Sequence, residues 1–167
     1  MSTRRVIRRV QPAAGLKVAA ADDGSTLRSV SPPFRHRLRV RYSECDLQGV
    51  VFNANYLTYL DETMTELFRS ALNGGYAAMV EAGVDMVVAE TSLRYLAPAR
   101  FDDEIDVEAT ITRLGTTAMT TAMRVTRAGE PLTEAELRHV FVRAGEGGKT
   151  PMPDSVREAL EPWSTSA

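Results

Sequence analysis

The sequence contains few residues that bind metals or form cross-links. Its 167 residues include one cysteine, Cys45, and two histidines, His36 and His139. A lone cysteine cannot form a disulfide within the chain, and so few sulfur and imidazole groups argue against zinc and iron–sulfur sites. We therefore expect a protein without a metal or any other cofactor.

Long hydrophobic segments are also missing. No run of eighteen apolar residues occurs, so we expect no membrane-spanning helix. The N-terminal stretch lacks the apolar centre of a secretion signal, which makes the cytoplasm the expected location. Hydrophobic residues make up 44% of the chain and charged residues 25%, which is typical of a globular domain.

Charge is unevenly distributed along the chain. Residues 1–33 carry six basic and two acidic side chains, a net charge of +4, which leaves −6 for the remainder and −2 overall. A nucleic-acid-binding domain needs a basic body, whereas this body is acidic. We therefore expect no nucleic-acid partner.

The chain divides into a tail, one folded domain and a short end. Residues 1–33 finish in Ser31-Pro32-Pro33 and hold two strand-like stretches around Asp22-Asp23-Gly24-Ser25. This pattern predicts a basic tail or an accessory hairpin. We expect the folded domain over residues 34–162 and a C-terminal tail over 163–167.

Periodicity predicts the elements of the domain. From Phe34 to Tyr42, largely apolar residues alternate with four arginines, as in a half-buried strand. Over about 54–72, apolar residues recur at three- and four-residue steps, as on the buried face of a helix, before Asn73-Gly74-Gly75 ends the pattern. Further strands are expected over 84–96, 104–114, 117–127 and 134–144, and short helices over 76–82 and 153–160.

This order of elements predicts an α+β fold in which a five-stranded antiparallel sheet wraps around one long helix. Such a sheet leaves an open edge, and pairing that edge with a second copy is a common way to cover it. We expect at least a homodimer, and a tetramer is equally compatible with the sequence.

One segment combines features that suit acyl transfer. Asp46 follows a predicted strand, Gly49 permits a tight backbone path, and the long helix begins seven to nine residues after Asp46. The first turn of a helix has free N–H groups and partial positive charge. A carboxylate that attacks a carbonyl or activates water would therefore lie near donors that can hold an oxyanion.

Two stretches of the sequence carry a family resemblance. The first, from Tyr42 to Tyr56, resembles the signature of hotdog-fold thioesterases of the 4-hydroxybenzoyl-CoA thioesterase type, which include short acyl-CoA thioesterases linked to the Tol–Pal system. The second, Glu90 to Asp103, contains a Pro-Ala-Arg that is similar to a family motif between two strands. The resemblance covers about residues 34–160 and implies the hotdog fold, with an active site at the dimer interface.

The resemblance also implies roles for individual residues. Asp46 matches the catalytic aspartate, which acts as nucleophile or as general base. Asn53 falls where the family presents a backbone N–H to the thioester oxygen, and Asp61 matches a carboxylate of the acyl pocket. The implied substrate-binding positions are Gly49, Val51, Asn55, Tyr56, Asp61 and Arg113.

The sequence departs from the family at one turn. Hydroxybenzoyl-type members carry a short basic run for the CoA nucleotide before the fourth strand, whereas Arg113 is the only basic residue in the segment 113–117. Phosphate recognition is therefore weaker, built elsewhere, or directed at the phosphopantetheine of a carrier protein.

We expect the hydrolysis of an acyl thioester, of CoA or of an acyl-carrier protein, to a free acid and a thiol. The alternatives are dedicated release of a polyketide or fatty acyl chain from a carrier protein, and a non-catalytic acyl-binding protein. A hydratase is disfavoured, because that chemistry usually needs a histidine and none lies between Arg37 and Arg138. His36 and His139 alternate with core residues, which predicts structural roles.

Overall fold

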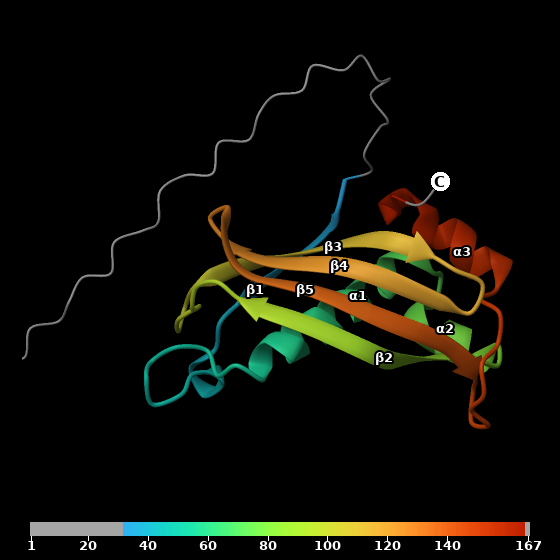
Figure 1. Ribbon diagram of the computed structural model, residues 1–167, viewed down its shortest axis with the longest axis horizontal. Helices are drawn as coiled ribbons and strands as arrows, with labels where there is room; N and C mark the ends of the chain where they lie inside the picture. Colours follow the sequence, from blue (N-terminus) through green and yellow to red (C-terminus); the bar gives the residue numbers. More distant parts are fainter. Residues whose placement is uncertain (1–31, 166–167) are drawn as a thin grey trace, which may run out of the picture.

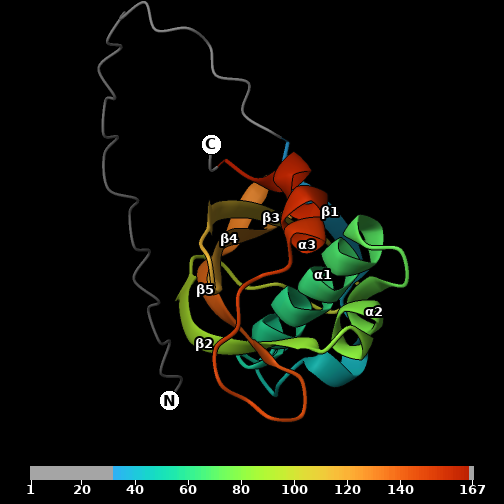
Figure 2. The ribbon, with the colours of Figure 1, turned by 90° about the vertical axis from the view of Figure 1, so that its right-hand side faces the viewer.

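A five-stranded antiparallel sheet curves around one long helix. The computed structural model describes residues 32–165, and its strands lie in the order β1-β3-β4-β5-β2. The helices α1, α2 and α3 lie on the same side of the sheet (Figures 1 and 2). The strands are β1 (Phe34–Arg39), β2 (Val84–Tyr95), β3 (Glu104–Leu114), β4 (Ala118–Arg127) and β5 (Glu130–Arg143). The helices are α1 (Asn55–Ala71), α2 (Gly75–Glu81) and α3 (Asp154–Leu160), with the short 3-10 helices η1 (Tyr42–Glu44) and η2 (Glu161–Trp163).

These elements confirm the predicted fold and correct two of its boundaries. The first strand ends at Arg39 rather than Tyr42, because the chain turns into η1. The last strand begins at Glu130 rather than at residue 134, because Ala128 and Gly129, with φ angles of 50° and 86°, form a tight hairpin turn directly after β4. The hairpin predicted within residues 1–33 falls on residues outside the described range.

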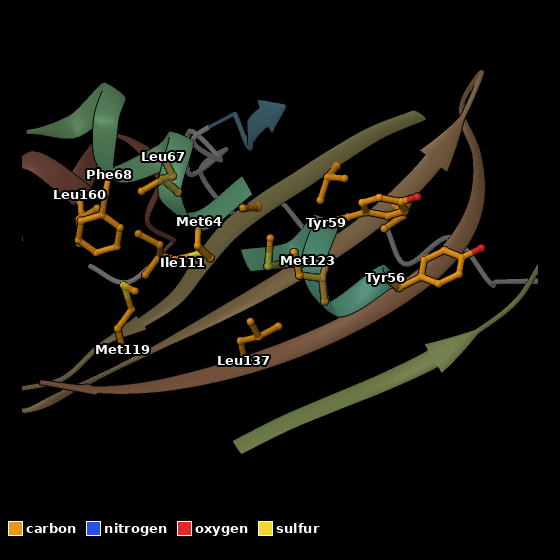
Figure 3. Close-up of a cluster of buried hydrophobic side chains, with 14 of the residues drawn as sticks. Tyr56, Tyr59, Met64, Leu67, Phe68, Ile111, Met119, Met123, Leu137 and Leu160 are labelled. Atoms are coloured by element: carbon orange, nitrogen blue, oxygen red, sulfur yellow. The ribbon is translucent and has the colours of Figure 1, made fainter. Parts of the chain in front are cut away.

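The core lies between α1 and the inner face of the sheet. Leu60, Leu67 and Phe68 of α1 are completely buried. The sheet residues in the same cluster include Ile111, Met119 and Met123 (Figure 3). Burying one large apolar side chain contributes about 2 kcal/mol, so the contact between α1 and the sheet is the main source of stability in the domain.

Irregular positions in the strands help the sheet to curve around α1. The pairing register shifts between Ile111 and Arg113 of β3 and between Val125 and Thr126 of β4. A further shift lies in β2, where Ala89 has no partner on β5. Such bulges bend a strand and increase its local twist.

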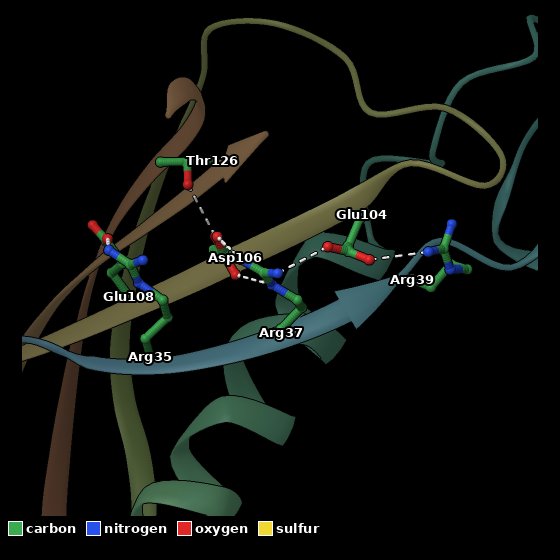
Figure 4. A network of polar contacts seen from close by, with 7 residues as sticks. All are labelled: Arg35, Arg37, Arg39, Glu104, Asp106, Glu108 and Thr126. Atoms are coloured by element: carbon green, nitrogen blue, oxygen red, sulfur yellow. Dashed lines mark hydrogen bonds and ion pairs between the residues drawn. The ribbon is translucent and has the colours of Figure 1, made fainter. Parts of the chain in front are cut away.

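Ion pairs cover the outer face of the sheet along β1 and β3 (Figure 4). The shortest contact of each arginine joins Arg35 to Glu108 (2.6 Å), Arg37 to Asp106 (2.7 Å) and Arg39 to Glu104 (3.0 Å). The hydrogen bond from Arg37 lowers the pKa of the Asp106 carboxyl. Because these carboxylates offset the arginine charges, this face offers no strongly basic patch for a phosphate.

The segment after α3 contacts the sheet. The Thr165 N–H donates to the Ile111 carbonyl at 2.9 Å, and the Trp163 ring lies edge-on to Phe34 with 5.6 Å between centroids. The described part of the expected C-terminal tail, residues 163–165, is therefore in contact with the domain. None of the helices within residues 32–165 has both the length and the apolar content that a membrane crossing requires.

Candidate active site

The chain between β1 and α1 closes into a small hairpin that carries Asp46. The Phe52 N–H donates to the Glu44 carbonyl, and the Asp46 N–H donates to the Val50 carbonyl, both at 2.9 Å. At the tip, the Gly49 N–H donates back to the Asp46 carbonyl at 2.9 Å. Gly49 has a φ of +73°, which glycine adopts without the steric cost that other residues bear.

The Asp46 side chain is partly exposed on this hairpin. Its Oδ1 accepts a hydrogen bond from the Gln48 N–H at 2.7 Å. Within residues 32–165, Oδ2 has no hydrogen-bond partner. One carboxylate oxygen is therefore held in place while the other is available to a substrate or to water.

Helix α1 begins a few residues after Asp46 and has free donors at its start. No side chain caps the helix, and its N-cap residue is Ala54. In the described part of the chain, the backbone N–H groups of Asn53 and Ala54 donate to no protein atom. Asn53 directly follows Phe52, whose N–H closes the hairpin of Asp46. This order suits a thioester group that is approached by a carboxylate on one side and by an N–H on the other.

Glu44 fastens the hairpin to α1, a role that the sequence analysis missed. Its carboxylate accepts hydrogen bonds from the Tyr59 hydroxyl at 2.8 Å and from the Arg41 N–H at 2.7 Å. Its carbonyl also accepts a bond from the Asn55 side-chain amide at 2.8 Å. Burial, together with the bond to Glu44, raises the pKa of Tyr59 above its ordinary value. The Asn55 amide, for which substrate binding is expected, is thus engaged in holding this hairpin.

The second motif of the sequence supports the hairpin from the other side. The Val51 N–H donates to the Ala99 carbonyl, and the Ala99 N–H donates to the Tyr56 hydroxyl, both at 2.9 Å. Burial raises the pKa of Tyr56, so its hydroxyl stays neutral. The Arg100 guanidinium also donates to the Gly49 carbonyl at 3.4 Å.

A cavity of about 250 Å³ opens beside the start of α1. It is lined by Val51, Asn53, Tyr56 and the segment 95–98. The Tyr95 hydroxyl donates to the Asn53 carbonyl at 3.0 Å, which ties the end of β2 to the start of the helix. The structure thus brings Val51, Asn53 and Tyr56 together on one cavity, next to the hairpin of Asp46 and Gly49.

Two of the expected site residues lie elsewhere. Asp61 lies on the exposed side of α1, two turns beyond its start, and lines a separate cavity with His139. Arg113 lies near the C-terminal end of β3, whereas the first residue of β3, Glu104, lies at the end of the sheet near the hairpin. Nine residues of strand separate the two, so Arg113 is roughly 30 Å from the hairpin end of the sheet. Within one chain, Arg113 and Asp46 are not part of the same site.

No set of residues suited to a metal ion is present in the described chain. Across residues 32–165, no three His, Cys, Asp or Glu side chains come close enough together to hold one.

The fold and the comparisons with known proteins define the protein's class. Residues 48–134 match the sequence model of the Thioesterase superfamily, and the chain belongs to that superfamily. Over 110 residues it is 34% identical to the acyl-CoA thioester hydrolase YbgC of Escherichia coli. This alignment covers 65% of this chain and 81% of that protein. Asp46 lies two residues before the range that the superfamily model matches.

Solved structures agree with this family. A hypothetical protein of Thermus thermophilus is 31% identical, with a TM-score of 0.70 over 77% of this chain and 98% of that one. The dynemicin thioesterase is 23% identical, with a TM-score of 0.73 over 81% of this chain and 99% of that one. This second likeness shows a shared fold, and the expected hotdog architecture is confirmed.

The bond between Tyr59 and Glu44 yields a first prediction. Tyr59→Phe removes the hydroxyl that holds the carboxylate and leaves the ring in place. We expect the free energy of unfolding to fall by about 1–3 kcal/mol and thioester turnover to fall as well, because the hairpin of Asp46 loosens. Denaturant titration and steady-state kinetics measure the two effects.

Tyr42→Phe is the matched control for this prediction. Tyr42 lies on the same connection and is 81% exposed, so the loss of its hydroxyl should change neither stability nor turnover. Equal results for the two variants would contradict the role assigned to Glu44.

Proposed function

We propose that this protein hydrolyses acyl thioesters at the site formed by Asp46 and the start of α1. Membership of the Thioesterase superfamily supports the reaction, and the relative named above acts on acyl-CoA. The observation that carries the assignment of residues is that, in the described chain, neither the Asp46 Oδ2 nor the Asn53 N–H, which lie on one short connection between β1 and α1, has a protein partner. Release of an acyl chain from a carrier protein is a variant of the same reaction.

In this mechanism the thioester oxygen lies against the Asn53 N–H. Asp46 acts either as general base, taking a proton from water that attacks the carbonyl carbon, or as nucleophile, forming a mixed anhydride that water then opens. In both routes the negative charge that develops on the oxygen is held by the N–H and by the partial positive charge of the helix start. The carbon–sulfur bond breaks, and the products are a free acid and a thiol.

Asp46→Asn tests this assignment. The amide retains the size of the side chain but is a poor base and nucleophile, so we expect turnover of an acyl-CoA panel to fall by about 10²–10⁴-fold. Glu158→Gln neutralises an exposed carboxylate on α3 and should leave turnover unchanged. An Asp46→Asn protein that hydrolyses thioesters at the normal rate would remove Asp46 from the mechanism.

We further propose that two copies pair through β2. This strand is an edge of the sheet, and four large apolar side chains at or next to it are 44–51% exposed: Val87, Val88, Tyr95 and Leu96. An open edge with apolar side chains favours pairing with another chain. Because Tyr95 and Leu96 also line the cavity at Asn53, such pairing would enclose the thioester site.

Ala89→Lys tests the dimer. Ala89 is exposed and has no partner on β5, so a lysine there places a charge on the edge without disturbing the ladder. We expect sedimentation analysis to detect weaker self-association, and turnover to become dependent on protein concentration. Ser70→Lys, at an exposed position on α1, is the control. A monomeric wild-type protein with full turnover would exclude the dimer.

A basic cavity supports recognition of the phosphates of the substrate. Arg113, Arg138 and Lys149 line a cavity of about 270 Å³ together with residues 115–118. Among the described residues, Arg113 and Lys149 form no ion pair, whereas Arg138 lies 3.3 Å from Glu90. In an antiparallel pair of β2 strands, this cavity of one protomer lies toward the hairpin end of the other. We therefore assign it to the phosphates of CoA or of phosphopantetheine.

The double variant Arg113→Ala, Lys149→Ala distinguishes recognition of the phosphates from recognition of the acyl group. We expect KM for acyl-CoA to rise by roughly tenfold or more, because a charge-assisted hydrogen bond contributes about 1.5–3 kcal/mol. The same variant should hydrolyse an acyl-pantetheine, which lacks phosphate, as well as the wild type does. An unchanged KM for acyl-CoA would remove this cavity from substrate binding.

A further inference from the structure

The tip of the hairpin that carries Asp46 lies outside the core. Two of its hydrogen bonds return to Asp46 itself, because the Gln48 N–H donates to Oδ1 and the Gly49 N–H donates to the carbonyl. Leu47 is completely exposed, and a methyl group added at Gly49 would meet no atom within 4 Å outside the adjacent residues. The orientation of the Asp46 carboxylate therefore depends on a turn that receives little support from packing.

One side chain joins this tip to another part of the domain. Among the hydrogen bonds of residues 46–50 within the described range, only that from the Arg100 guanidinium to the Gly49 carbonyl, at 3.4 Å, comes from outside the hairpin. Arg100 lies in the loop between β2 and β3, at the same end of the sheet as the hairpin (Figure 1). It forms no ion pair with the described residues, so its charge is available to strengthen this bond.

The backbone at Arg100 is firmly held. Its N–H donates to the Asp103 carboxylate at 2.8 Å, and that carboxylate accepts a further bond from Arg127 at 2.7 Å. Burial opposes the ionisation of Asp103, but these two bonds outweigh it and keep the pKa of the carboxyl below its ordinary value. The preceding residue, Ala99, is completely buried and donates its N–H to the Tyr56 hydroxyl. The Arg100 side chain therefore extends to the hairpin from a fixed base.

We propose that Arg100 is a positioning residue, which holds the tip of the hairpin and thereby keeps the Asp46 carboxylate in its reactive orientation. The proposal rests on the thioesterase activity proposed above, because it concerns the same site. The contacts run from the guanidinium to the Gly49 carbonyl, through the turn to the Gln48 N–H, and from there to Asp46 Oδ1. Because Glu44 fastens the base of the same hairpin, the base and the tip have separate supports.

A direct contact between Arg100 and the substrate would have a different kinetic signature. Guanidinium groups bind phosphates well, and the loss of a residue that binds the phosphates of CoA raises KM. A residue that orients the reacting carboxylate acts in the chemical step, so its loss lowers kcat and leaves KM unchanged. The two roles are therefore separated by steady-state kinetics.

Arg100→Met tests the proposal, because it keeps much of the side-chain length and removes every donor. We expect kcat for acyl-CoA to fall by roughly three- to tenfold, with KM unchanged. Arg100→Lys retains a charged donor and should recover part of the loss. In an Asp46→Asn protein, Arg100→Met should have no further effect on kcat, because the group that it orients is gone. Arg124→Met removes an exposed arginine from the outer face of the sheet and should change neither constant.

Hydrogen exchange provides a second readout that does not require turnover. The Gln48 and Gly49 amides both donate to Asp46, so we expect rapid-mixing experiments to show faster exchange at these amides in Arg100→Met than in wild type or Arg124→Met. Unchanged exchange at the tip would overturn the proposal, as would a loss of turnover that consists of a rise in KM. Faster exchange, together with an Asp46→Asn protein that hydrolyses thioesters at the normal rate, would show that Arg100 holds the tip and that the assignment of the reaction to Asp46 fails.

Discussion

The structure depends on the burial of one face of α1 against a sheet that must curve to receive it. Leu60, Leu67 and Phe68 are removed from water only because β3, β4 and β5 bend around the helix. The strength of this contact has a consequence at the start of the helix. Most helices begin with a side-chain cap that contributes about 1 kcal/mol, and α1 has none. Since the core fixes the helix, the N–H groups of Asn53 and Ala54 directly before it can stay free for a ligand.

The two acids near the start of α1 have different tasks because their surroundings differ. Glu44 and Asp46 are only two residues apart. The Glu44 carboxylate is turned toward α1, where the Tyr59 hydroxyl and the Arg41 N–H bind it, and its side chain is 17% exposed. Asp46, on the hairpin that Glu44 fastens, keeps one oxygen without a protein partner in the described chain. Sequence order alone would allow either acid to be the reactive one.

Local patterns in the sequence were sufficient to predict the elements and their arrangement. The hydrophobic period of α1 and the alternation in β3 arise because each element buries one face against a neighbouring surface. Such patterns can be recognised within a short stretch of sequence. The prediction that Asp46 and the start of the helix form one site rests on the same kind of local information, since nine residues separate Asp46 from the first residue of α1. The boundary errors at Arg39 and Glu130 arose where turn geometry, rather than periodicity, ends a strand.

The features that sequence analysis missed depend on pairing between distant strands. Arg138 and Lys149 join Arg113 only because β5 lies next to β4 and the chain after β5 folds back toward it. Because these residues are far apart in the sequence, a pattern of consecutive basic residues near Arg113 does not reveal them. Likewise, the alternation in β5 correctly predicted that His139 is buried, but it gave no information on whether the imidazole has a hydrogen-bond partner there.

The exposed edge of β2 and the cavity that Asp61 and His139 line are linked by geometry. Met86 and Val88 of β2 line the cavity of His139, and Val88 is 51% exposed in the isolated chain. Pairing of β2 with a second copy would reduce the access of water to that cavity. A polar contact with a ligand is stronger when water cannot compete for it. A ligand that binds the dimer more tightly than the monomer must, by linkage, stabilise the dimer. Ligand binding in that cavity and the proposed self-association would therefore reinforce each other.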